Sequence, residues 1–113
     1  MNTVQMTEEI VADLYDKLNK DIPDLTDAII EREVKNVIRE LKMKRNYAAT
    51  SMSDKEIEAD VENYYSVIRN IAEVRCAKLG AEGEQSHTEN GVTRMYVSED
   101  ILWKGVHAFV RVF

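Results

Sequence analysis

Residues that form covalent or metal cross-links are scarce in this sequence. Cys76 is the only cysteine, which excludes an internal disulfide, and the two histidines, His87 and His107, lie far apart. Because a structural metal site draws on a cluster of cysteines and histidines, no metal and no other cofactor is expected. No apolar run approaches the ~20 residues that a helix needs to cross a bilayer. The sequence therefore predicts no membrane partner.

Basic residues are also in deficit, with 15 Lys and Arg against 21 Asp and Glu and a formal net charge of −6. This balance argues against a protein whose main task is to grip a phosphate backbone. The first residues, MNTVQMTEEIV, contain no basic stretch followed by an apolar one, so folding in a cytoplasm is expected. A chain of 113 residues, 44% of them hydrophobic, has room for one core, which predicts a single domain over residues 1–113.

Apolar residues at helical spacing are what the sequence does contain. Thr7 is expected to cap a first helix that runs to about Leu18 and covers the rest of the fold as a lid. Pro23 marks a connection, after which Thr26 caps a second helix that ends in a run of basic residues. The positions predicted to face the core are Ile10, Val11, Leu14 and Leu18 in the first helix, and Ile30, Val34, Val37, Ile38 and Leu41 in the second.

The strongest local signal is the capping box formed by Ser53 and Glu56, which opens a third and longer helix. This helix is expected to continue unbroken to Leu79, with Gly80 as its left-handed C-cap. The positions predicted for its core face are Ile57, Val61, Tyr64, Tyr65, Ile68, Ile71, Ala72 and Leu79.

Turn-forming residues dominate the next segment, where Asn90-Gly91 is a favoured centre for a two-residue turn. The pattern predicts a β-hairpin over Gln85–Val97, whose polar first arm requires a partner, because a hairpin without an apolar face is marginal alone. A short helix around Trp103 and a strand or extended tail over Val106–Phe113 follow. The expected fold is mainly α: a small bundle of two long antiparallel helices plus shorter N- and C-terminal helices, with a β-hairpin and an extended C-terminal tail.

No residue pattern supports catalysis, and no enzyme activity is expected. Ser86, His87 and Glu89 are the residue types of a hydrolytic triad, but neighbours in an extended arm point to opposite faces and do not converge. Cys76 is expected to be a small buried residue rather than a nucleophile. His107, in an apolar segment, is expected to be a packed or interface side chain rather than a ligand.

Charges of opposite sign gather on the second and third helices. Lys42, Lys44 and Arg45 suit the negative end of the helix macrodipole, which favours a structural role over phosphate contact. The positive and negative edges would pair either within one chain or between neighbours arranged head to tail, as in closed rings. The sequence leaves both arrangements open. The acidic edge comprises Asp54, Glu56, Glu58, Asp60 and Glu62.

Several segments together resemble the head-tail connector family of tailed phages and prophages, whose members are often labelled DNA packaging proteins. The longest segment is residues 79–94, LGAEGEQSHTENGVTR, and residues 69–72, RNIA, precede it. Residues 34–41, VKNVIREL, and 63–69, NYYSVIR, add to the likeness, which covers roughly residues 26 to 105.

This resemblance implies a helical adaptor of which about a dozen copies form a ring beneath the portal protein of the filled head. The ring would receive the tail through a tail-side connector or tail-completion protein, and DNA would pass through its channel without specific binding. The protein would be made in the bacterial host cytoplasm and end in the virion. An acidic chain fits such a channel, because like charge prevents adhesion within about 10 Å at ordinary salt.

The predicted hairpin is where contacts with a neighbouring subunit or the portal are expected. An alternative reading of the residues is a small helical nucleic-acid-binding regulator that uses Lys42, Lys44 and Arg45, at the basic end of the second helix. That alternative predicts salt-sensitive DNA binding. The hairpin residues expected to make the contacts are Ser86, His87, Glu89, Asn90, Gly91 and Arg94.

Overall fold

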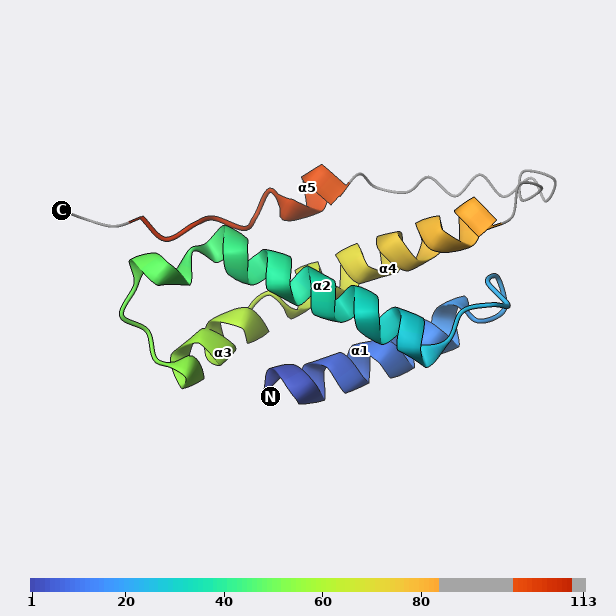
Figure 1. Cartoon of the computed structure of the whole chain (residues 1–113), viewed down its shortest axis with the longest axis horizontal. Helices are drawn as coiled ribbons and strands as arrows, with labels where there is room; N and C mark the ends of the chain where they lie inside the picture. The colour runs from blue at the N-terminus through green and yellow to red at the C-terminus, as the bar shows by residue number, and fades with distance from the viewer. Residues whose placement is uncertain (84–98, 111–113) are drawn as a thin grey trace.

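The structure, a computed structural model, describes residues 1–83 and 99–110 (Figure 1). Within these ranges the chain forms five α-helices and a short 3-10 helix, and it contains no strand. The predicted mainly α fold is confirmed at this level. The β-hairpin predicted over residues 85–97 lies outside the described residues.

Helix α1, Thr3–Leu18, begins earlier than the sequence predicted. Asn2 is the N-cap: its side chain accepts a hydrogen bond from the Gln5 backbone N–H at 2.8 Å, and the Gln5 side chain accepts one from the Asn2 backbone N–H at 3.0 Å. The prediction of Thr7 as the cap is wrong, because this reciprocal capping box lies five residues upstream. Thr7 is inside the helix, where its hydroxyl donates to the Thr3 carbonyl at 2.7 Å.

α1 is part of the core rather than a lid over it. The apolar side chains on its core-facing side are almost completely removed from solvent, and the helix packs against α2, α3 and α4. Met6, which the predicted core face omitted, is as deeply buried as Ile10 because the helix starts a turn earlier. The buried residues of this stripe are Met6, Ile10, Leu14 and Leu18.

Helix α2, Asp27–Arg45, has the N-cap that the sequence predicted: the Thr26 hydroxyl accepts a hydrogen bond from the Ile29 N–H at 3.2 Å. It ends at Asn46, which has a positive φ of 56° and takes the left-handed conformation that asparagine tolerates at a helix C-terminus. A 3-10 helix, η1, follows at Tyr47–Ala49. All five predicted core positions are buried: Ile30, Val34, Val37, Ile38 and Leu41.

The predicted single long third helix is wrong, because it is divided into α3, Asp54–Glu62, and α4, Tyr65–Gly83. The capping box of Ser53 is present at the start of α3. At the division the Tyr64 N–H bonds the Val61 carbonyl at 2.9 Å, the tighter i→i−3 pattern that often ends an α-helix. The helical ribbon is therefore interrupted between α3 and α4 (Figure 1).

The C-terminal half of α4 also differs from expectation. The helix continues through Gly80, so the predicted C-cap there is wrong. A lone glycine lowers helix stability by only about 1 kcal/mol, which is too little to end a helix by itself. Leu79, predicted on the core face, is 38% exposed.

Helix α5, Glu99–Trp103, is the predicted short C-terminal helix, and Trp103 is its buried residue. Residues 104–110 leave it without regular structure and run past the C-terminal end of α2, where the Phe109 N–H bonds the Arg45 carbonyl at 2.8 Å. α2 and α4 run in opposite directions along the long axis and cross (Figure 1). One core joins α1, α2, α3, α4 and α5.

Candidate functional site

The residues predicted to contact a neighbouring subunit or the portal lie outside the described residues: Ser86, His87, Glu89, Asn90, Gly91 and Arg94. In residues 1–83 and 99–110, no three His, Cys, Asp or Glu side chains are grouped in a way that would hold a metal ion. Over the same ranges, no helix combines the length and the apolar character needed to cross a membrane. The described part of the chain instead offers two clusters of charged side chains that hold the C-terminal segment, and one basic groove.

The first cluster, here called the tail clamp, consists of Arg45, Tyr47 and Asp60. The Arg45 guanidinium forms two hydrogen bonds with the Asp60 carboxylate, at 2.8 and 2.9 Å, and the Tyr47 hydroxyl donates to the same carboxylate at 2.6 Å. Arg45 and Asp60 are only 11% and 14% exposed. Such a two-pronged, largely desolvated pair is among the stronger ionic contacts in proteins.

Each group of the tail clamp has a shifted pKa. Burial alone would raise the pKa of Asp60, but the hydrogen bonds from Arg45 and Tyr47 outweigh burial and lower it. Burial and the hydrogen bond to Asp60 raise the pKa of Tyr47, and the hydrogen bond to Asp60 raises the pKa of Arg45. The cluster therefore stays charged on Arg45 and Asp60, and neutral on Tyr47, across the neutral pH range.

Arg45 also holds the C-terminal segment against the end of α2. Its guanidinium donates to the His107 carbonyl at 2.5 Å and lies 4.1 Å from the Phe109 ring centroid, close enough for a cation–π contact. Asn46 adds a hydrogen bond from its side-chain amide to the Phe109 carbonyl at 3.2 Å. The hydrogen bond from Arg45 uses the backbone carbonyl of His107, and His107 itself is exposed.

The second cluster, here called the α5 clamp, consists of Arg75, Glu40 and Glu99, and joins α4 to α2 and α5. Arg75 donates to the two Glu99 oxygens at 2.8 and 3.2 Å, and it also bonds Glu40. The hydrogen bond from Arg75 lowers the pKa of Glu99. Trp103 Nε1 lies near the same carboxylate but outside ordinary hydrogen-bond geometry.

The basic run at the end of α2 is used mainly within the chain. Arg45 belongs to the tail clamp, and the Lys44 ammonium lies 5.1 Å from the Trp103 ring centroid. Lys42 is exposed. The sequence left open whether the charged edges pair within one chain or between neighbouring copies. For Arg45 and Asp60, the structure shows pairing within one chain.

Cys76 is completely buried in α4, as predicted. Burial, together with the negative charge of Glu33, raises the pKa of its thiol to about 12. Because the thiolate is the reactive form of cysteine, this side chain is unreactive at neutral pH.

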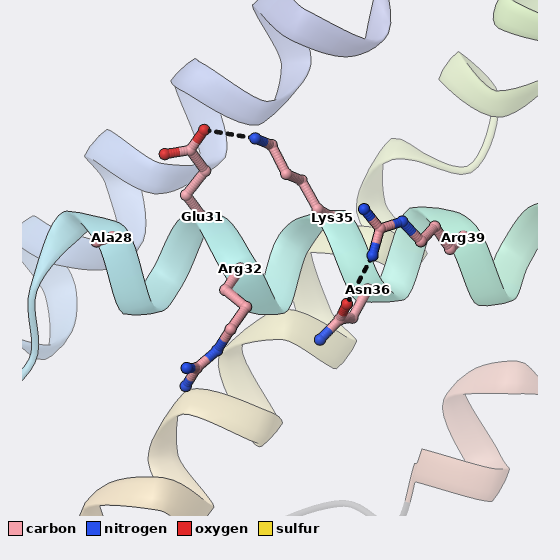
Figure 2. A pocket seen from close by; sticks show the side chains of 6 residues that line it. All are labelled: Ala28, Glu31, Arg32, Lys35, Asn36 and Arg39. Atoms are coloured by element: carbon pink, nitrogen blue, oxygen red, sulfur yellow. Dashed lines mark hydrogen bonds and ion pairs between the residues drawn. The ribbon is translucent and has the colours of Figure 1, made fainter.

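A shallow groove of about 270 Å³ lies on the outer face of α2 (Figure 2). Lys35 pairs with Glu31 at 2.9 Å, and Arg39 donates to Asn36 at 3.4 Å. The spacing of these residues is enough to predict from the sequence that they share the polar face of α2. It does not predict that the rest of the chain leaves this face uncovered. The lining residues are Ala28, Glu31, Arg32, Lys35, Asn36 and Arg39.

A comparison of the chain with known protein families, with characterised proteins and with solved structures finds no match.

Proposed function

We propose that this protein is a noncatalytic head-tail connector subunit of a tailed phage or prophage, one copy in a ring beneath the portal protein. The proposal is carried by the resemblance over residues 79–94 together with residues 34–41 and 63–72. In this role the ring joins the DNA-filled head to the tail, and the net charge of −6 keeps passing DNA from adhering.

Two structural features support the proposal. The mainly helical fold agrees with a helical adaptor. The α5 clamp joins α4, which precedes the predicted hairpin, to α5, which follows it, and to α2, so that a polar hairpin would be presented from a fixed support. A hairpin that needs an external partner suits a contact with a neighbouring subunit or the portal.

Electron microscopy of the protein mixed with the portal protein from the same phage or prophage genome tests the proposal directly. We expect a ring of the protein bound at one end of the portal assembly. Adaptors of this type can assemble only on their partner, so the mixture is the informative sample. A portal that carries no added density at saturating protein would contradict the proposal.

Replacing Gly91 by valine is expected to abolish assembly on the portal while leaving the helices folded. A two-residue hairpin turn needs a positive φ at this position, which a β-branched residue strongly disfavours. Helical circular dichroism measures the fold, and electron microscopy or co-sedimentation with the portal measures assembly. Gly105→Val is the matched control, because a Cβ at Gly105 meets no atom within 4 Å. Loss of helical signal in Gly91→Val, or assembly equal to that of the control, would be the contrary result.

The nucleic-acid-binding alternative makes a distinct prediction. It requires salt-sensitive DNA binding through Lys42, Lys44 and Arg45, whereas we expect no shift of duplex DNA at physiological salt, where non-specific binders have a Kd of about 10⁻⁴–10⁻⁶ M. Among the described side chains, Arg45 forms an ion pair and Lys44 lies over the Trp103 ring, so the exposed Lys42 is the cation chosen for the test. A gel-shift series over salt concentration measures this. A shift that Lys42→Gln weakens would favour the alternative.

A further inference from the structure

The outer face of α1 carries two carboxylates that have no ion-pair partner in the described part of the chain. Two other acidic residues of α1 are used internally: Glu9 accepts a hydrogen bond from Tyr65 at 2.9 Å, and Asp13 pairs with Arg69 at 3.4 Å. Glu8 and Asp16, by contrast, are exposed. They lie eight residues apart, which is about 12 Å along a helix axis.

The outer face of α2 carries the complementary charges. Arg32 and Arg39 are both exposed and line the groove drawn in Figure 2. Arg39 bonds only the neutral Asn36 among the described side chains, and Arg32 lies 3.8 Å from the adjacent Glu33. The two arginines are seven residues apart, about 10 Å along the axis. Along the helix axis alone, their spacing is close to that of Glu8 and Asp16.

Each of the two faces also carries one exposed apolar side chain next to its charged residues. Met43, four residues after Arg39, is 80% exposed, and Val4, four residues before Glu8, is 64% exposed. These are the most exposed large apolar side chains in the described helices. If α1 of one copy lies antiparallel on α2 of another, Val4 meets Met43, Glu8 meets Arg39 and Asp16 meets Arg32. The small Ala12 lies between the two acidic residues and lets the helices approach.

We infer that the outer face of α2 binds the outer face of α1 in a second copy of this chain, in this antiparallel register. Because the two faces belong to different helices, the contact is heterologous: it leaves the α2 face of one copy and the α1 face of the other free. Such contacts form rings when the rotation closes and filaments when it does not. The inference rests on the proposed ring and names the surfaces that build it.

The contact is expected to be weak for an isolated pair. Two helices that meet over about 18 Å bury much less than the ~800 Å² per partner of a standard interface. Ion pairs at such a surface are also screened by salt, with a Debye length of about 10 Å at 0.1 M. Association in solution should therefore require high protein concentration and low salt, and should strengthen when a ring closes.

Charge reversal on each face separately tests the inference. The variant Glu8→Arg/Asp16→Arg and the variant Arg32→Glu/Arg39→Glu should each remain monomeric in sedimentation equilibrium at about 1 mM protein and low salt, with an apparent Kd at least tenfold weaker than wild type. Mixing the two variants should restore association, because the reversed α1 face of one then meets the reversed α2 face of the other, and the two native faces also have opposite charge. A mixture that stays monomeric while the wild type associates would overturn the inference, as would a monomeric wild type at this concentration.

Cross-linking supplies the register and separates the two proposals. A mixture of Val4→Cys and Met43→Cys chains should form a disulfide-linked dimer under mild oxidation in at least fivefold higher yield than Val4→Cys mixed with Lys55→Cys, an exposed control on α3. The native Cys76 is buried and does not interfere. Equal yields would overturn the register. Portal binding without any effect of charge reversal would refute only this inference, and self-association without portal binding would refute only the connector function.

Discussion

Replacing Arg45 by methionine is expected to destabilise the protein by about 3 kcal/mol, the cost typical of removing one partner of a buried ion pair. Methionine keeps most of the side-chain length but leaves the Asp60 carboxylate, only 14% exposed, without its cation. The contacts to His107 and Phe109 are lost at the same time. Urea denaturation followed by helical circular dichroism measures the change, and Lys35→Met, at an exposed site of the same helix, is the control.

Acid titration gives the same prediction a second readout. The pKa of Asp60 is lowered in the folded protein, so its stabilising effect is complete above the unfolded value of about 3.9 and is lost as pH falls through the folded value. The stability difference between wild type and Arg45→Met should therefore narrow below about pH 4. A difference below about 0.5 kcal/mol at neutral pH, no larger than that of an ordinary surface substitution, would contradict the role assigned to this pair.

Replacing Leu14 by alanine is expected to cost between about 2 and 5 kcal/mol, the range for deleting a buried leucine side chain. Leu14 is completely buried between α1 and the rest of the core, and alanine leaves a cavity while preserving helix propensity. Tyr15→Ala, at a residue of the same helix that is 38% exposed, should cost clearly less. Thermal and urea unfolding measure both variants.

The Leu14→Ala variant tests whether α1 unfolds together with the rest of the core or separately from it. If α1 were a lid, its loss would leave a folded remainder, and unfolding would show a separate early transition. We expect a single cooperative transition for both variants, because α1 shares one core with α2, α3 and α4. A biphasic transition in Leu14→Ala would support the lid that the sequence predicted.

Local signals in the sequence predicted the helices well where a cap coincided with apolar periodicity. Thr26 and Ser53 mark the starts of α2 and α3 because each side chain bonds the N–H three residues on. Asn2 was missed because Thr7, followed by two glutamates, gives a similar signal. The division at Tyr64 was also missed, since Tyr64 and Tyr65 both fit the apolar stripe of a continuous helix and only the hydrogen bond from the Tyr64 N–H to the Val61 carbonyl shows the interruption.

Neither clamp could be predicted from sequence spacing. Arg45 meets Asp60 from the next helix and the His107 carbonyl from the far end of the chain, and Arg75 joins Glu40 to Glu99. The sequence did show that the basic and acidic edges were complementary. The same residue pattern is expected whether these edges pair within one chain or between two copies, so the sequence could not decide between them. Tertiary geometry alone separates Arg45, which is used internally, from Arg32 and Arg39, which are exposed.

The two clamps have a mechanical consequence for the C-terminal segment. Residues 99–110 are attached at two separate points, α5 to α4 and α2 through Arg75, and the tail to α2 through Arg45. A pull on the C-terminal end would load the hydrogen bonds of Arg45 and Asn46 first, and would reach Arg75 only after the tail had detached. The segment would therefore come away in two steps, and the force at the first step would report the strength of the tail contacts alone.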